Sequence, residues 1–235
     1  MGIADQIQAE LNDVLRTPWD VRSGRVVPDT ENIALRGGGV RFDAVILYAD
    51  MAGSSSLVKR LSDTAAAHVY KCFLHGCCRV IRERGGEVTA FDGDRVMAAF
   101  LGDGKELRAA MCGLQINWVV REVITPSLKR QHGLPPDFSV GHAVGIDASP
   151  ILVAKTGIRN YNDLVWVGRA ANVAAKLSGL REAASTAWIT GQVFDRLTND
   201  TKYGGEPRRL MWEQQSWMFE GDSLRLHRSN WTWKP

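Results

Sequence analysis

The sequence predicts an α+β fold of the ferredoxin-like βαββαβ kind, with extra elements at both ends of the chain. Three observations predict it. An apolar, β-branched run of strand length begins at residue 41, a long helical pattern follows it, and two short strands joined by Asp-Gly come next. A second helix and further strands complete the order, and these strand pairs do not fit a strictly alternating βαβ chain.

Length and composition set the domain organisation. A chain of 235 residues, 45% of them hydrophobic, is long enough for one well-filled core, so we expect one domain with additions at its ends. We assign residues 1–40 to an N-terminal helix and linker, 41–200 to the compact domain and 201–235 to an extension that completes its sheet. The helix covers residues 3–15, where apolar positions recur at helical spacing, and the polar, glycine-rich stretch 16–39 is the linker.

The first half of the compact domain has the clearest local signals. Residues 41–50 predict a strand that ends in a carboxylate, and the GSSS after it predicts a turn. Ser62 is expected to cap a helix that the glycine pair 85–86 ends. EVTAF and RVMAAF then predict a hairpin around an Asp-Gly-Asp turn. A second helix is expected over residues 105–124, ending before Pro126.

The second half predicts more strands and one more helix. Residues 137–146 and 150–157 are expected to pair, with an Asp-Ala-Ser-Pro turn between them and a loop around Tyr161 after them. Small residues at helical spacing predict a helix over 168–180. AWIT predicts a further strand, and residues 223–233 predict the last one.

Charge and composition exclude several classes of protein. The formal net charge is +3, with 29 basic and 26 acidic residues spread through the chain, so we expect no nucleic-acid partner. No apolar run approaches the roughly 18–20 residues that span a bilayer, and the acidic, amphipathic start is unlike a secretory leader. We therefore expect no membrane partner and a cytoplasmic location. The four cysteines fit neither a disulfide framework nor a zinc site.

Two carboxylates are the first candidates for chemistry. Asp50 ends the strand at 41–50, and Asp94 lies at the tip of the predicted hairpin. Mg²⁺ and Mn²⁺ bind carboxylate oxygens together with substrate phosphate oxygens, and usually take only one or two protein carboxylates per ion. If the two strands are neighbours in the sheet, both carboxylates reach the same pair of ions. Aspartate is also a common turn former, so a purely structural role is the alternative.

Three segments resemble the motifs of a known family. YADMAGSSSL and FDGDRVMAAF resemble the two metal-site motifs of the class III adenylate and guanylate cyclases, and VGRAANVAAKL resembles the third motif. The three occur in the family's order, within a resemblance that covers residues 41–197. The resemblance implies the class III cyclase fold and an enzyme that turns a nucleoside triphosphate into a 3′,5′-cyclic monophosphate and pyrophosphate.

The resemblance also implies roles for particular residues. Asp50 and Asp94 would hold two Mg²⁺ or Mn²⁺ ions per site, with help from the backbone carbonyl of Met51. Asn172 would orient the ribose, and Lys176, in place of the family's usual arginine, would stabilise the transition state. A solvated Asn and Lys on a surface helix are the alternative. The residues implied in phosphate binding, through backbone N–H groups at the start of the next helix, are Gly53, Ser54, Ser55 and Ser56.

Two departures from the family concern the base. Adenylate cyclases have a purine-reading lysine three residues before the hairpin glycine, where this chain has Ala90. The partner position, three residues before the glycine of the third motif, is normally Asp or Thr and is Val165 here. The domain is therefore either a degenerate, non-cyclising relative or an enzyme that reads another base. The intact Asp50, Asp94 and Asn172 and the basic Lys176 favour the second.

The base that we expect is a pyrimidine. Trp166 and the missing purine readers resemble the pyrimidine cyclases of the bacterial anti-phage Pycsar systems, which make cyclic UMP or cyclic CMP as an alarm signal for a separate effector. Tyr48, Phe91 and Trp166 are bulky enough to fill the space that a one-ring base leaves in a purine-sized pocket. We favour UTP, mainly because uridylate cyclases are frequent in that family. Adenylate cyclase activity, making cAMP, and a catalytically silent nucleotide-binding module are the alternatives.

The resemblance further implies a homodimer with composite sites. In the family the metal aspartates come from one subunit, and the asparagine and the transition-state base come from the other. The triphosphate tail also needs a basic partner. The candidates, each of which is alternatively a solvated charge, are Lys155, Arg169, Arg225 and Arg228.

Overall fold

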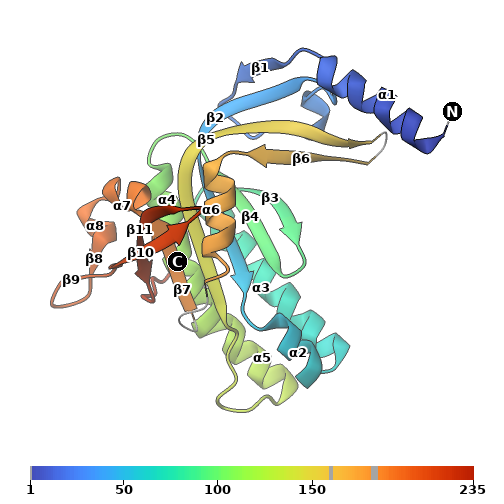
Figure 1. The fold of residues 1–235 in the computed structure, drawn as a ribbon. Helices are drawn as coiled ribbons and strands as arrows, with labels where there is room; N and C mark the ends of the chain where they lie inside the picture. The colour runs from blue at the N-terminus through green and yellow to red at the C-terminus, as the bar shows by residue number, and fades with distance from the viewer. Residues whose placement is uncertain (1, 159–160, 181–184) are drawn as a thin grey trace.

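The computed structural model describes residues 2–158, 161–180 and 185–235 (Figure 1). The strands are β1 (Asp20–Ser23), β2 (Gly38–Met51), β3 (Glu87–Asp92), β4 (Arg95–Phe100), β5 (His142–Ile158), β6 (Tyr161–Val167), β7 (Ser185–Thr190), β8 (Tyr203–Gly204), β9 (Arg209–Leu210), β10 (Glu213–Phe219) and β11 (Asp222–Ser229). The helices are α1 (Ile3–Arg16), the 3₁₀ turn η1 (Thr30–Asn32), α2 (Ser54–Arg60), α3 (Asp63–Glu83), α4 (Lys105–Val119), the π-turn η2 (Val120–Ile124), α5 (Thr125–His132), α6 (Arg169–Leu177), α7 (Gly191–Asp195) and α8 (Asn199–Lys202).

The main sheet confirms the predicted fold class. Its strand order is β10-β11-β7-β5-β2-β4-β3, with β1 paired to β2 and β6 paired to β5. The central part of the chain follows the order β2-α3-β3-β4-α4-β5, and its four strands lie side by side as β5-β2-β4-β3. This order of elements and strands is the ferredoxin-like arrangement.

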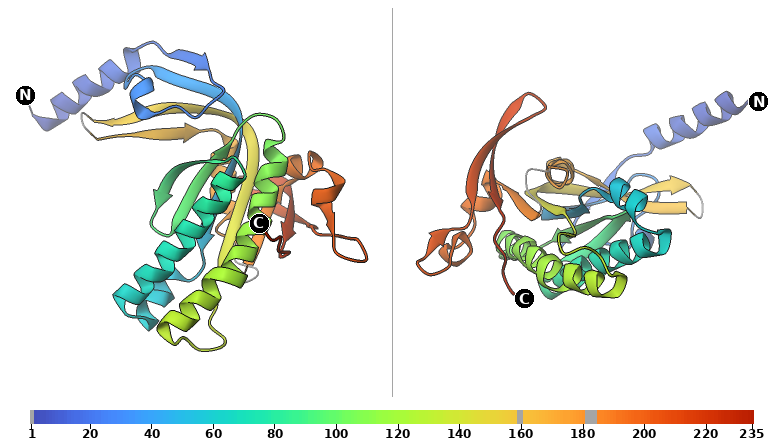
Figure 2. Two further views of the ribbon diagram at one scale, coloured as in Figure 1. Left: turned by 180° about the vertical axis from the view of Figure 1, so that it is seen from behind. Right: turned by 90° about the horizontal axis from the view of Figure 1, so that it is seen from below.

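Helices cover both faces of the sheet (Figure 2). α3 and α4 pack on one face, where Val45 and Leu47 of β2 meet Phe73 of α3 in the larger core. α6 packs on the opposite face, over Ile46 of β2 and Ile151 of β5. Because successive residues of a strand point to opposite faces, the middle of β2 is apolar on both sides.

Two local predictions are confirmed. Ser62 caps α3, since its hydroxyl accepts a hydrogen bond from the Ala65 N–H at 3.3 Å. β3 and β4 form the expected hairpin, with Asp92 opposite Arg95. Gly93 between them has a φ of 60°, a left-handed value that glycine adopts without strain.

The turn expected at residues 147–150 is wrong, because β5 is one unbroken strand. The carboxylate of Asp147 accepts hydrogen bonds from side chains of α6 and β7 instead of from a local turn. Ser149 likewise accepts a backbone N–H of α6. These tertiary partners override the local turn tendency. The loop expected around Tyr161 falls partly on residues 159–160, which lie outside the described residues, and from Tyr161 onward the chain forms β6 and pairs with the far half of β5.

One expected helix boundary and one expected turn are wrong as well. The second helix does not end before Pro126 but continues through η2 into α5. Pro126 falls in the first turn of α5, where the missing N–H is tolerated, and the π-turn shifts the hydrogen-bond register just before it. The GSSS segment is not a free turn, because α2 begins at Ser54.

Both ends of the chain contain strands that the sequence does not reveal. Within residues 16–39, β1 pairs in parallel with β2, which begins at Gly38. The last strand is shorter than the expected 223–233 and forms a hairpin with β10. β1 is exposed along its length and β10 is at most half-buried, so neither has an apolar run of full strand length. After β11 the chain lies along α4, where the Trp233 N–H donates to the Leu114 carbonyl at 3.1 Å.

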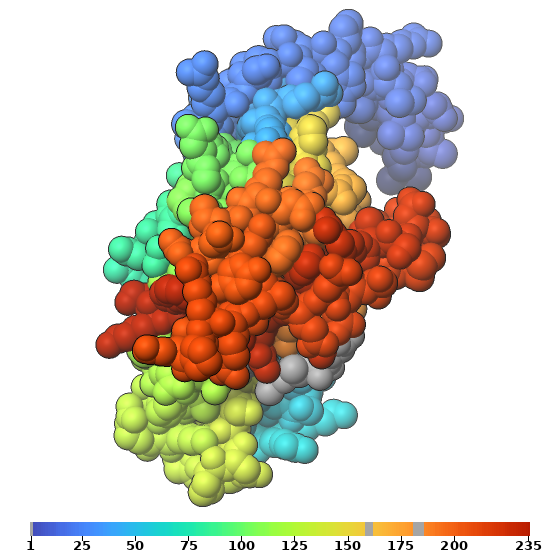
Figure 3. Space-filling model, turned by 90° about the vertical axis from the view of Figure 1, so that its left-hand side faces the viewer, coloured from blue at the N-terminus to red at the C-terminus, as the bar shows by residue number. Residues whose placement is uncertain are grey.

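α1 has the predicted helical form but buries no side chain. It stands away from the rest of the molecule, whose surface on the side shown in Figure 3 is formed largely by residues 185–235. In the part of the chain that the structure describes, none of the helices combines the length and the apolar character needed to cross a bilayer.

Candidate active site

The two candidate carboxylates lie on neighbouring strands. Asp50 of β2 is opposite Arg95, the first residue of β4, and Asp94 directly precedes Arg95 at the hairpin turn. Asp94 is thus one residue along the chain from the position opposite Asp50, and directly opposed residues of antiparallel strands have Cα atoms about 4.5–5.5 Å apart. Asp50 follows Ile46 and Tyr48 in the alternation of β2, so it faces the side of the sheet that α6 covers. The fold therefore brings Asp50 and Asp94 together at one end of the sheet.

One oxygen of this pair lacks a partner. Oδ2 of Asp94 is buried and has no hydrogen-bond partner. A buried carboxylate oxygen without a donor is costly unless a cation or a donor binds it. Carboxylate oxygens are the ligands that Mg²⁺ and Mn²⁺ prefer, so Asp50 and Asp94 fit ions of this kind.

The donor set suits an ion that is shared with a substrate. The described residues contain no cluster of three or more His, Cys, Asp or Glu side chains that could enclose a metal. Met51 can add only its backbone, because its side chain is 2% exposed and lies in the core. Mg²⁺ commonly binds to one or two carboxylates and completes its shell with water and substrate phosphates.

The start of α2 lies directly after this pair. Gly53 has a φ of 72°, and its carbonyl accepts hydrogen bonds from the N–H groups of Ser56 and Leu57, both at 3.0 Å. The N–H groups of Ser54 and Ser55 precede these first intrahelical bonds. A hollow of about 410 Å³ lies between α2 and the loop before β5. The residues lining it include Ala52, Gly53, Ser56, Arg60, Asp137 and Ser139.

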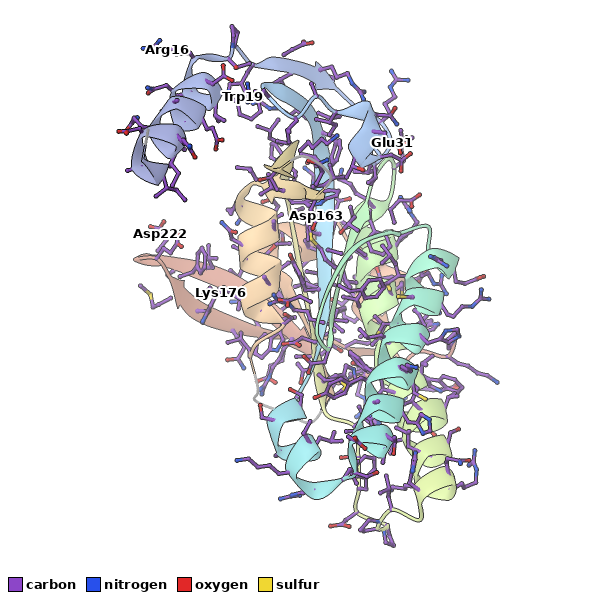
Figure 4. All side chains as sticks on the ribbon, turned by 90° about the vertical axis from the view of Figure 1, so that its right-hand side faces the viewer. Arg16, Trp19, Glu31, Asp163, Lys176 and Asp222 are labelled. Atoms are coloured by element: carbon purple, nitrogen blue, oxygen red, sulfur yellow. The ribbon has the colours of Figure 1, made fainter. Side chains whose placement is uncertain are left out.

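Asn172 and Lys176 lie on the outer face of α6. Both side chains are exposed, whereas Val173 and Ala174 between them are buried against the sheet. Their spacing of four residues puts them on one side of the helix, and Figure 4 shows Lys176 on the side turned away from the sheet. Within one chain, α6 thus directs both side chains away from the strand that contains Asp50.

Tyr48 and Ala90 lie in one row across three strands. Met97 of β4 is opposite Tyr48 on one side and Ala90 on the other. Tyr48 is half-buried, and the guanidinium carbon of Arg95 lies 5.1 Å from the centroid of its ring. Burial raises the pKa of Tyr48, and the charge of Arg95 partly opposes that shift. Phe91, expected in the same pocket, is 59% exposed and follows Ala90 on the other side of β3.

Val165 and Trp166 are not gathered around Tyr48 within one chain. Trp166 of β6 is opposite Val153 of β5, whereas Tyr48 is opposite Gly145, roughly 26 Å back along the strand. Trp166 packs on a phenylalanine of β2 with ring centroids 5.8 Å apart, and its indole N–H is buried without a partner. Val165 is 41% exposed on the other face of β6.

The arginine candidates for the triphosphate tail are held by carboxylates of the same chain. The ion pairs are Arg169 with Asp147, Arg225 with Asp195 and Arg228 with Glu213. Lys155, the fourth candidate, is half-buried in the far half of β5, beside β6. These pairings explain how the arginines are positioned without a ligand.

Arg95 is a further residue of this region that was not among the candidates expected from the sequence. Its guanidinium lies 2.6 Å from Asp92 and over the ring of Tyr48, and Arg95 itself is opposite Asp50 in the sheet. Its place directly after Asp94, inside the hairpin motif, is the signal that could have identified it. A guanidinium here adds positive charge beside a site that is expected to receive phosphate oxygens.

Comparisons with known proteins give the chain's relatives and the solved structures of similar fold. No family model matches the chain. The chain is 40% identical over 235 residues to a protein named uridylate cyclase from Xanthomonas perforans, across 100% of this chain and 99% of that protein. Its fold is similar to that of the adenylyl cyclase CyaB from P. aeruginosa, with a TM-score of 0.68 and 17% identity over 81% of this chain and 95% of that one. The guanylyl cyclase Cya2 gives a TM-score of 0.68 and 19% identity over 84% and 96%.

Proposed function

Because this chain belongs to the uridylate cyclases, which share the class III cyclase fold, we propose that it converts UTP to 3′,5′-cyclic UMP and pyrophosphate. The observation that carries the proposal is the pair Asp50 and Asp94 on neighbouring strands, with one oxygen buried and unpartnered. In the reaction the ribose 3′-oxygen bonds to the α-phosphorus, and the bond from that phosphorus to the leaving pyrophosphate breaks. The proton of the 3′-hydroxyl passes to solvent.

Each candidate residue has a defined task in this reaction. Two Mg²⁺ or Mn²⁺ ions held by Asp50 and Asp94 would activate the 3′-hydroxyl and neutralise the charge of the leaving pyrophosphate. Asn172 holds the ribose by hydrogen bonding, so that the 3′-oxygen is aligned with the phosphorus. Lys176 offers positive charge to the crowded phosphorus, although it lacks the planar fork of an arginine. Backbone N–H groups after Gly53 bind phosphate oxygens.

The active form is proposed to be a homodimer with two composite sites. α6 directs Asn172 and Lys176 away from the sheet that contains Asp50 and Asp94. In the dimer one subunit supplies the carboxylates, and the other supplies the asparagine and the lysine. A single chain would then hold only half of each site.

The row formed by Tyr48 and Ala90 supports a one-ring base. Ala90 offers no polar group to a purine, and the Tyr48 ring, held by Arg95, fills space on the same face of the sheet. A purine needs more room than a uracil beside such a ring. Phe91, Val165 and Trp166 are proposed as substrate contacts only in the assembled dimer, because one chain does not gather them around Tyr48.

The product is proposed to act as a signal in anti-phage defence. The support is membership of the uridylate cyclases together with the resemblance to the Pycsar pyrimidine cyclases. A separate effector protein is proposed to bind cyclic UMP.

The decisive experiment compares the four ribonucleoside triphosphates. Purified protein is incubated with Mn²⁺ and ATP, GTP, CTP or UTP in turn, and the products are separated by mass. Cyclic UMP from UTP, with release of pyrophosphate, is the expected result. Cyclic AMP alone would replace the base assignment with adenylate cyclase activity. Nucleotide binding without any product would indicate a catalytically silent module.

A further inference from the structure

A buried carboxylate lies beneath the first turn of α6. Asp147 of β5 is 0% exposed, and its Oδ1 accepts hydrogen bonds from the Thr190 hydroxyl at 2.6 Å and from Arg169 Nη2 at 3.1 Å. Arg169 is the first residue of α6. The same Nη2 also lies 2.9 Å from the Ala148 carbonyl and 2.7 Å from Gln192 Oε1. One ion pair therefore joins α6 to β5, β7 and α7.

This ion pair is a poor source of stability. The second oxygen of Asp147 is buried without a partner, and the Arg169 side chain is 39% exposed, so solvent screens the attraction between the two charges. Burial also raises the pKa of Asp147, although Thr190 and Arg169 oppose that shift. Arg169 is placed at the positive end of the helix dipole, where a cation is unfavourable. Each residue is unfavourable alone, so their pairing points to a geometric role.

Arg169 lies on the same face of α6 as the candidate catalytic residues. Arg169, Asn172 and Lys176 are spaced by three and four residues, so they share one side of the helix. The far half of α6 lies directly on β5, because a Cβ at Gly145 would lie 2.2 Å from the Ala174 carbonyl oxygen. The near end is held by Arg169 and by the Ala170 N–H, which donates to Ser149 at 3.0 Å.

A small rotation of α6 about its own axis would have a large effect on the rate of cyclisation. Side-chain ends lie about 5–6 Å from the axis of a helix, so a turn of about 20° moves them by roughly 2 Å. A misplacement of about 1 Å at a reacting centre is enough to lower a rate about 100-fold. Positioning of Asn172 and Lys176 thus depends on how firmly the first turn is held.

We propose that Asp147 and Arg169 are positioning residues for the cyclisation, because their ion pair sets the rotation of α6 and with it the places of Asn172 and Lys176. This inference rests on the proposed function. Neither residue needs to touch the substrate. The pair acts by joining the start of α6 to three other elements of the same subunit.

The test compares Asp147→Asn, Arg169→Gln and the double variant with the wild type. Each single change should lower kcat about 10- to 100-fold and change KM for UTP less than about threefold, because the groups proposed to hold the triphosphate and the base lie outside α6. The double variant should be several-fold more active than Asp147→Asn, since no unpaired arginine is left. The matched control is Arg196→Gln, which breaks the pair between an exposed arginine and the buried Glu106 at 3.2 Å. It should keep kcat within about twofold.

Hydrogen exchange gives a second measurement that does not depend on turnover. Amides of residues 169–177 should exchange faster in Asp147→Asn and Arg169→Gln than in the wild type, and not in Arg196→Gln. Wild-type kcat in both single variants, a loss that follows Tm, or unchanged exchange in α6 would each overturn the positioning role. A wild type that forms no cyclic UMP contradicts the proposed function instead, and the exchange measurement still decides the role of the pair.

Discussion

Replacing Asp94 by asparagine should reverse the order of stability between the metal-free and the ligand-bound protein. Without metal, the buried and unpartnered Oδ2 of Asp94 costs about 1–3 kcal/mol, and Asp94→Asn removes that uncompensated charge. The variant should therefore match or exceed the wild-type Tm, by about 2–4 °C for each kcal/mol regained. With Mn²⁺ and a nucleotide at 100 times Kd, the free energy of unfolding of the wild type should rise by about 2.7 kcal/mol, which raises its Tm by roughly 5–10 °C. The Tm of the variant should rise little.

Thermal unfolding followed by circular dichroism measures all four states. The nucleotide is 3′-deoxy-UTP, which lacks the attacking hydroxyl and so binds without turnover. Asp92→Asn is the matched control, because the Asp92 side chain is 77% exposed on the same hairpin, and this variant should keep the ligand-induced rise in Tm. If the ligand raises the Tm of Asp94→Asn as much as that of the wild type, the assignment of Asp94 as a metal ligand is refuted.

Three further predictions follow from the same structure. Mixing an Asp50→Ala chain with an Asn172→Ala chain should restore roughly one quarter of wild-type activity, because random pairing makes half of the dimers heterodimers, each with one intact site. If both variants fold and form dimers but the mixture stays inactive, the proposed composite sites are contradicted. Burial lowers the pKa of His227 to about 4, with Arg225 adding to the shift. The unfolded chain therefore binds more protons between about pH 6.5 and 4, and the free energy of unfolding should fall by about 1–2 kcal/mol as pH drops through that window, after allowance for solvent screening. In urea titrations, His227→Phe should make the free energy of unfolding less dependent on pH in this window. The same pH dependence as in the wild type would contradict the role of His227. Tyr48→Ala should raise the ratio of cyclic AMP to cyclic UMP formed from equal ATP and UTP about tenfold. An unchanged ratio would show that the Tyr48 ring does not border the base.

Local signals predicted the elements that depend on nearby residues. The hairpin needed only a glycine with positive φ between two apolar runs, and Gly93 supplies it. The start of α3 needed only a hydroxyl three residues before an N–H, and Ser62 supplies that. The motifs also pointed to Asp50 and Asp94, and the pairing of β2 with β4 shows that the strands that end and begin beside them are neighbours in the sheet.

Elements that depend on distant residues could not be predicted in this way. The turn tendency at residues 147–150 is overridden by Thr190 and by α6, which come later in the chain. The placement of Trp166 depends on the register between β5 and β6, for which the sequence gives no local signal. The role proposed for Asp147 was hidden for the same reason, because an aspartate before Ala-Ser-Pro favours a turn.

The long pairing of β2 with β5 also affects how the chain folds. These strands are antiparallel partners from Gly39 with Ala154 to Met51 with His142, and all of α3 and α4 separates them along the chain. At a synthesis rate of about 5–20 residues per second, β2 would leave the ribosome roughly 5–20 seconds before its partner. During this delay an apolar strand edge is open to other chains, and loop closure over such a distance slows folding. Newly made protein should therefore need a chaperone at high expression.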